Sequence, residues 1–196
     1  MILPRNLQAF ADKRNAVVIG TNNVWNVLSG FPLKADHVVM LDKDFWMKGW
    51  KNWLGYSGCF QDCVPVLGFE PNPPPKSFIP IKIELQRLAS ASPAYERGRY
   101  FHGMSSGCAA IQFALHAGVT EIFLLGHDLR VAEGKTHGNG VRTNHELVQN
   151  YPQGRGMIQG YQVAYEHAQK LGVNMVNLSP VSALTFIPHG DVANGS

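Results

Sequence analysis

Residues 103–130, GMSSGCAAIQFALHAGVTEIFLLGHDLR, contain the strongest structural pattern in the chain. Two serines and a glycine at 105–107 precede apolar residues with helical spacing, and this stripe ends near Gly118. Such an order is typical of a helix with a serine N-cap and a glycine at its C-terminal end. The run VTEIFLLG at 119–126 is apolar almost throughout, as expected for a strand buried on both faces. The stretch therefore predicts a helix followed by a strand.

Similar units are expected along the rest of the chain. Apolar runs predict strands at 16–20, 36–42, 63–67, 77–84 and 173–180. Helices are expected at 23–29, 45–53 and 154–172, with a short final helix within 180–191. Strands of unbroken hydrophobicity that alternate with helices favour an α/β fold. We expect a Rossmann-like, three-layer, open and mostly parallel sheet with helices on both faces.

Length and composition predict one domain over residues 1–196, with a loop-rich insertion at about 55–103 and a functional loop at about 127–153. The chain is 45% hydrophobic and only 16% charged, which suits a folded protein and not a disordered one. It has no signal-peptide pattern and no long apolar run, so no membrane association is expected. Its three cysteines, an odd number, fit a reducing compartment, and we expect a cytoplasmic protein.

The net charge of the chain indicates which kinds of ligand or partner it could bind. The net charge is +3, and no run of lysine or arginine exceeds two residues. Nucleic acid is therefore disfavoured as a partner, whereas a small anionic ligand suits this balance. The composition is compatible with a homo-oligomer.

Several turns should lie together at one edge of the sheet, because ligands in such folds bind beyond the carboxyl ends of parallel strands. These turns are GTNN at 20–23, LDKD at 41–44, GHDLR at 126–130 and NLSP at 177–180. The start of the helix at Ser105 should face the same edge. The candidate ligand-binding residues are therefore Gly20, Asn22, Asn23, Asp42, Ser105, Ser106, Gly107, His127 and Ser179, with Asp128 beside them.

The helix start at 105–107 has two interpretations. Unpaired N–H groups and the helix dipole favour an anion there, and a glycine lets a ligand approach the backbone, so a phosphate would fit. The alternative is a plain N-cap, which many helices have. The turn GTNN lacks both the G-x-G-x-x-G pattern and the P-loop lysine, so neither motif is predicted. Its asparagines either bind a nucleotide or stabilise the turn.

One loop region contains three histidines and an aspartate: His127, His137, His145 and Asp128. Such a group could form a metal site or supply a general base. Their spacing does not match a zinc signature, so a single histidine acting as acid or base is favoured and no metal site is predicted. Cys59 and Cys63 have no second pair nearby and are expected to pack in the core or a loop.

The segment SSGCAAIQFALHAGVTEIFLLGHDLR resembles the pattern S-G-x-x-A-x-x-x-A-x-x-x-G-x-x-x-I-x-L-x-G-x-D. Bacterial lipooligosaccharide sialyltransferases and 6-hydroxymethylpterin diphosphokinase-like domains share this pattern. The later stretch LGVNMVNLSPVSALTFIP is similar to their closing strand and turn. Overall the chain looks most like small proteins of tailed phages and prophages, which would place it in the host cytoplasm. The resemblance covers 100–190 well and 16–45 weakly.

In the sialyltransferases this edge holds a cytidine nucleotide sugar. The resemblance implies that Asn22, Ser106 and Gly107 lie at the nucleotide, that Asp128 lies near the ligand, and that His137 is the catalytic base. The family's tyrosine pair is matched only by Tyr151. The diphosphokinases' acidic Mg²⁺ site is matched loosely by Asp42, Asp44 and Asp128.

These features predict a nucleotide-dependent transferase, glycosyltransferase-like, with a nucleotide or nucleotide sugar as donor. The predicted catalytic residues are His137, as the base, and Asp128. One alternative is Mg²⁺-dependent diphosphate transfer from ATP. Another is a phage protein that binds or sequesters a nucleotide without turnover, since fold does not settle function. A weaker alternative is a virion or scaffold component that uses the aromatic segment 45–60 as an interface.

Overall fold

A computed structural model describes the chain in segments that include most of the expected strands. The described residues are 7–21, 35–41, 43, 63–68, 70, 79–80, 83–84, 100–101, 105–129 and 152–190.

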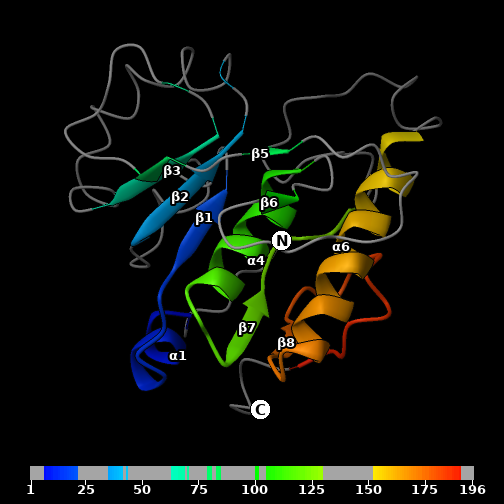
Figure 1. Cartoon of the computed structure of the whole chain (residues 1–196). Helices are drawn as coiled ribbons and strands as arrows, with labels where there is room; N and C mark the ends of the chain where they lie inside the picture. Colours follow the sequence, from blue (N-terminus) through cyan, green and yellow to red (C-terminus); the bar gives the residue numbers. More distant parts are fainter. Residues whose placement is uncertain are drawn as a thin grey trace, which may run out of the picture.

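The strands are short and all of their pairings are parallel (Figure 1). One sheet has the order β1-β2-β3-β4. Its strands are β1 (Ile19–Thr21), β2 (His37–Met40), β3 (Val64–Leu67) and β4 (Ile79–Pro80). Two further pairs are β5 (Ile83–Glu84) with β6 (Tyr100–Phe101), and β7 (Glu121–Leu124) with β8 (Asn174–Asn177). The described residues thus form an α/β fold with parallel sheets.

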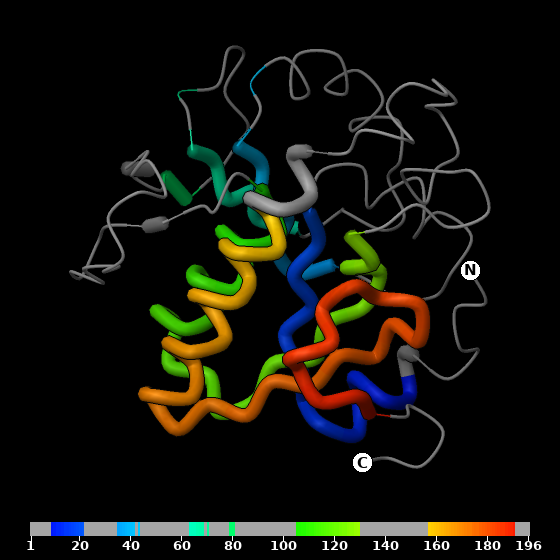
Figure 2. Tube along the Cα trace, turned by 90° about the vertical axis from the view of Figure 1, so that its right-hand side faces the viewer, coloured from blue at the N-terminus to red at the C-terminus, as the bar shows by residue number. Residues whose placement is uncertain are grey.

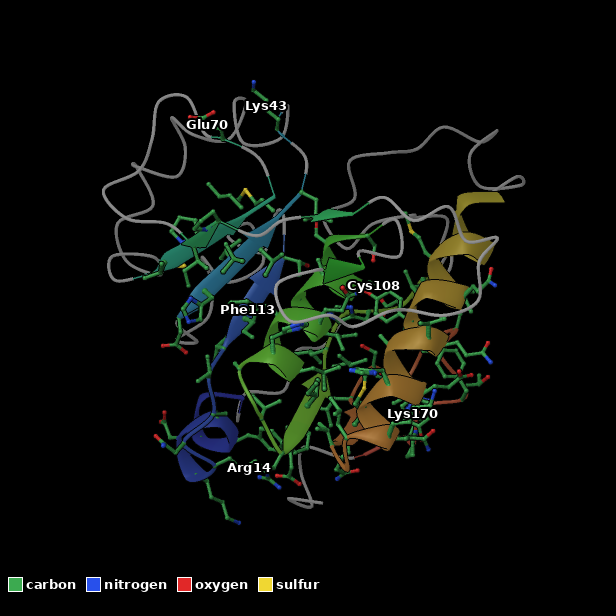
Figure 3. The ribbon with its side chains drawn as sticks, in the orientation of Figure 1. Arg14, Lys43, Glu70, Cys108, Phe113 and Lys170 are labelled. Atoms are coloured by element: carbon green, nitrogen blue, oxygen red, sulfur yellow. The ribbon has the colours of Figure 1, made fainter. Side chains whose placement is uncertain are left out.

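Helix α4 (Ser106–His116) packs against the four-stranded sheet on one side and against the pair β7 and β8 on another. Ala109 and Ala110 lie in a cluster with Val39 and Val66 of the first sheet. Cys108, Ile111 and Leu115 lie instead in a cluster with residues of β7 and β8. Accordingly, Figure 3 shows Phe113 on the side toward β1 to β3 and Cys108 on the side toward helix α6 (Pro152–Lys170). A helix that is apolar on most of its circumference is expected to be buried in this way.

Helix α6 lies beside α4 in both views (Figures 1 and 2). Ala164 and Ala168 of α6 are completely buried in the cluster that α4 shares with β7 and β8. These small side chains allow two helices to approach closely. The spacing of four between Ala164 and Ala168 places both on the face of α6 that is buried in this cluster.

Helix α1 (Leu7–Lys13) packs against Phe123 of β7. Phe123 does not belong to the core cluster that contains Ile122 and Leu124. The rings of Phe10 and Phe123 are 5.0 Å apart in an edge-to-face arrangement. The guanidinium of Arg14 lies 4.1 Å from the Phe10 ring centroid, a cation–π contact. Because successive strand residues point to opposite faces, Phe123 faces away from Ile122 and Leu124, and α1 covers the other face of β7.

Most expected elements are confirmed, with shifted ends. The strand expected at 16–20 begins only at Ile19, and the helix expected at 154–172 begins at Pro152. The single edge strand expected at 77–84 is divided between β4 and β5, which belong to different sheets. The helices expected at 23–29 and 45–53 lie outside the described residues.

Two predictions about the ends of the chain need correction. The final helix within 180–191 is wrong for the described part, because 180–190 forms turns and one parallel bridge, between Asn177 and His189. Helix α1 was not predicted, although its apolar residues Leu7, Phe10 and Ala11 have helical spacing. None of the helices in the described segments is long and apolar enough to cross a membrane.

Candidate functional site

The first turn of α4 is capped by a side chain. Ser105 has extended backbone angles, φ −144° and ψ 146°, and its Oγ accepts the Cys108 N–H at 3.1 Å. The first N–H that a backbone carbonyl of this turn accepts is that of Ala109, which donates to Ser105 at 3.2 Å. The helix itself supplies no acceptor for the N–H groups of Ser106 and Gly107. The predicted serine N-cap is present here.

Gly107 is in direct contact with residues from two other elements. A Cβ atom at this position would lie 2.9 Å from two atoms of the His127 ring and closer still to the hydroxyl oxygen of Tyr161. His127 follows β7, whereas Tyr161 lies in α6. The glycine is therefore required for close packing of side chains against the helix start, whatever ligand binds beside it.

His127 and Tyr161 form a pair. The Nδ1 of His127 lies 2.6 Å from the Tyr161 hydroxyl oxygen, and the two rings pack edge to face at 5.5 Å. Tyr161 is only 2% exposed, while part of the His127 surface remains open to solvent. The protein atoms that crowd this ring desolvate it and lower the pKa of His127 to about 4. The imidazole is therefore neutral at physiological pH.

The loop that carries His127 contains two residues with left-handed backbone angles, Gly126 at φ 73° and Leu129 at φ 49°. Leu129 packs against the core, and this burial offsets the cost of its conformation. The loop therefore needs support from its surroundings.

The turn NLSP at 177–180 gives part of that support. The Ser179 Oγ accepts the Gly126 N–H at 2.6 Å. Asn177 Oδ1 in turn accepts the Ser179 N–H at 3.0 Å. Both side chains are almost completely buried, at 0% exposure for Asn177 and 2% for Ser179. They join the end of β8 to the end of β7.

Ser182 completes the support. Its hydroxyl donates to the His127 carbonyl oxygen at 2.7 Å and accepts the Leu184 N–H at 3.1 Å. The next residue, Ala183, donates its N–H to the Asp128 carbonyl oxygen at 2.8 Å. The segment 177–184 thus fixes the backbone of 126–128 from one side, while α4 and Tyr161 contact the His127 side chain.

The structure brings several predicted site residues together and leaves others undescribed. Ser105, Ser106 and Gly107 lie at the start of α4, where Gly107 faces His127. Asp128 is half-buried and follows His127 in the chain. Gly20 is buried inside β1 and pairs with Val38, so it is a strand residue and not part of a turn. Ser179 is buried and supports the loop. The remaining predicted residues lie outside the described residues: Asn22, Asn23, Asp42 and His137.

Two charged residues lie beyond strand ends. Lys43 follows β2 and Glu70 follows β3, both exposed, and Figure 3 shows them at the end of the molecule opposite Arg14 and Lys170. Within the described ranges, no three side chains of the metal-binding types lie together.

Comparisons of the chain with protein-family models, curated proteins and solved structures found no match. The family resemblance of the sequence analysis therefore stays a prediction.

The two cysteines in the described part are not suited to nucleophilic chemistry. Burial raises the pKa of Cys108 to about 12. Burial, together with the Asp36 carboxylate, likewise raises the pKa of Cys63 to about 12. Since the thiolate is the nucleophile, both thiols are inert at physiological pH. Cys63 is partly buried, as expected for a packing residue.

Two residues at this position, Tyr161 and Ser182, were not predicted from the sequence. Tyr161 belongs to an apolar stripe with Ala164 and Ala168, which resembles an ordinary buried helix face. Ser182 lies within the N-x-S-P-x-S-x-L turn that carries part of the family resemblance. Two serines spaced around a proline after a strand were the only signal for a hydrogen-bonding role.

Proposed function

We propose that the protein is a nucleotide-dependent transferase of a glycosyltransferase-like kind, whose nucleotide-activated donor binds at the carboxyl edge of the parallel strands. The observation that carries this proposal is the contact of Gly107, at the start of α4, with His127, which follows β7. It joins a helix start and a polar strand end at the place where parallel α/β sheets bind ligands.

The chemistry of this edge suits a phosphorylated donor. The start of α4 offers N–H groups without helical acceptors and the positive end of the helix dipole. A phosphate there would be stabilised as a leaving group without a covalent enzyme intermediate. The supports behind His127 and Asp128 keep this edge in one geometry, which favours catalysis by positioning.

The protonation state of His127 decides which histidine we assign as the catalytic base. His127 is neutral and its Nδ1 is occupied by Tyr161, so it is a poor candidate for the base. We assign proton abstraction from the acceptor hydroxyl to His137, in the functional loop, with Asp128 near the reacting groups. This assignment rests on the sequence pattern, because His137 lies outside the described residues.

A thermal-shift screen tests the proposal. CMP, CDP, UDP, AMP, ATP and nucleotide sugars are added with and without Mg²⁺, because ligands of the native state raise the melting temperature. We expect a rise with at least one nucleotide, and a smaller rise for Asp128→Asn. The control Glu121→Gln, an exposed residue at the opposite end of β7, should behave as the wild type. If no nucleotide raises the melting temperature, the proposal fails.

Product analysis then separates the alternatives. Release of free CMP or UDP from a nucleotide sugar supports the transferase. Strict dependence on ATP and Mg²⁺ would favour diphosphate transfer, and saturable binding without any product after long incubation would favour a sequestering protein.

A further inference from the structure

The His127 imidazole has one nitrogen engaged and one available. Nδ1 lies 2.6 Å from the Tyr161 hydroxyl oxygen. Within the described part of the chain, no hydrogen bond to Nε2 is present. Part of the residue as a whole is open to solvent.

The pairing with Tyr161 decides which nitrogen carries the proton. A phenol hydroxyl is a strong donor, and the unprotonated nitrogen of a neutral imidazole is a strong acceptor. With Tyr161 as the donor to Nδ1, the ring proton lies on Nε2. Two features oppose a second proton: the burial that lowers the pKa of His127 to about 4, and the positive end of the α4 dipole beside the ring. Asp128, the nearest acid in the chain, lies on the same loop and would favour a charged ring only weakly at this degree of exposure.

We propose that His127 binds a phosphoryl oxygen of the ligand through Nε2–H, as a neutral hydrogen-bond donor, and that Tyr161 is the positioning residue that fixes this tautomer. The proposal deepens the function proposed above and rests on it, since it assigns an atom to the phosphate of the donor.

The surroundings of Nε2 favour an anionic oxygen over other ligand groups. The ring faces the first turn of α4 at Gly107 through its Cε1 and Nδ1 atoms. The helix supplies no acceptor for the glycine N–H. The two groups that the site offers, Nε2–H and the start of the helix, are both donors. A phosphoryl group carries only acceptors and negative charge, so it complements both at once. Because a neutral Nε2–H stays protonated across physiological pH, the hydrogen bond to the phosphoryl group does not change with pH.

The first measurement needs no ligand. In protein labelled with ¹⁵N-histidine, the ring shifts of His127 should report the Nε2–H tautomer and show no protonation between pH 6 and 8. Tyr161→Phe should produce a mixture of tautomers, while His116→Gln, at the other end of α4, should leave the His127 signals unchanged. A protonated ring, or the Nδ1–H tautomer, in the wild type would overturn the proposal.

The second measurement uses calorimetric titration with CMP, cytidine and inorganic phosphate. His127→Leu should weaken CMP binding about tenfold, the usual effect of one hydrogen bond to a charged group, and leave cytidine binding unchanged. His127→Gln keeps a neutral donor and should restore most of the affinity. The ratio of CMP affinities for wild type and His127→Leu should stay constant from pH 6 to 8, because a cationic histidine would lose its effect above its pKa.

The arms of this titration separate the two proposals. Phosphate binding that depends on His127, without any nucleotide binding, supports the neutral donor and refutes the nucleotide-dependent transferase. Nucleotide binding that is equal in wild type and both His127 variants refutes the neutral donor and leaves the transferase standing. Absence of binding by all three probes overturns both. Melting curves confirm that each variant is folded, and Tyr161→Phe gives an independent test if His127→Leu is not.

Discussion

Gly107 and Tyr161 are in direct contact: the tyrosine hydroxyl occupies the space in which a side chain on residue 107 would begin. The two residues come from different helices, and the same hydroxyl also bonds His127. A glycine that looked like an opening for a ligand is thus also the place where α6 and the loop after β7 meet α4. This arrangement makes specific predictions about stability.

Gly107→Ala should lower the free energy of unfolding by about 1–3 kcal/mol, because the added methyl group overlaps with Tyr161 and His127. Urea denaturation measures this change. Tyr161→Phe removes the overlapping hydroxyl, so Gly107→Ala should cost less in that background, and a double-mutant cycle gives the coupling. Gly172→Ala, at φ 71° in open space, is the control and should cost about 1 kcal/mol. Equal costs of Gly107→Ala in both backgrounds would contradict the contact.

His127 should make stability depend on pH between about 4 and 6.5. Its pKa is lowered to about 4 in the folded protein, against an ordinary value of 6.5, so the unfolded chain binds more protons in this window. The stabilising contribution is therefore complete above pH 6.5 and is lost as pH falls toward 4, by up to about 3 kcal/mol. Unfolding measured from pH 4 to 7 should show a flatter profile for His127→Gln. Identical pH profiles for the two proteins would rule out a neutral, buried ring.

Loss of either supporting serine should weaken the loop after β7. Ser179→Ala leaves the Gly126 N–H without its acceptor, and Ser182→Ala leaves the His127 carbonyl oxygen and the Leu184 N–H unpaired. Each substitution should cost about 1–3 kcal/mol, the usual penalty for unpaired buried polar groups. Thr185→Ala, at the exposed position that follows this segment, should change stability by less than about 0.5 kcal/mol. Faster hydrogen exchange at Gly126 should accompany Ser179→Ala alone, and unchanged exchange there would argue against this bond.

Gln112→Met should stabilise the protein. Gln112 is 0% exposed in α4, and neither polar atom of its amide has a hydrogen-bond partner. An apolar side chain of similar length removes the cost of burying an unpaired amide, which is about 1–3 kcal/mol. The exposed Gln162 of α6 gives the matched control, and Gln162→Met should have little effect. A lower melting temperature for Gln112→Met would mean that the amide is satisfied in solution.

His137→Ala should abolish transfer to an acceptor and leave nucleotide binding largely intact, because a general base acts on the acceptor hydroxyl and not on the donor. Product formation and calorimetric titration measure the two effects separately. His189→Ala, an exposed histidine near the end of β8, should keep full activity. Unchanged turnover in His137→Ala would eliminate this histidine as the base.

Local patterns in the sequence were sufficient for much of the fold. The helix after Ser105 and the apolar strand that follows it were predicted with correct type and nearly correct ends, because periodicity, capping and hydrophobicity act within a few residues. The start of β1 was shifted, since pairing with β2 decides where regular hydrogen bonding begins. The final turns were misjudged as a helix. Their serines bond to the loop after β7, and such distant partners leave no periodic signal.

The sequence by itself determined that this is an α/β protein with a serine-capped helix, and that polar residues follow its strands. The tertiary structure alone decided which of these residues meet. His127 and Tyr161 are 34 residues apart in the chain, and their contact with each other and with Gly107 depends on how α6 packs beside α4. The charge of His127 follows from that packing, because desolvation by burial lowers its pKa, and burial is not a property of the residue or of its neighbours in sequence.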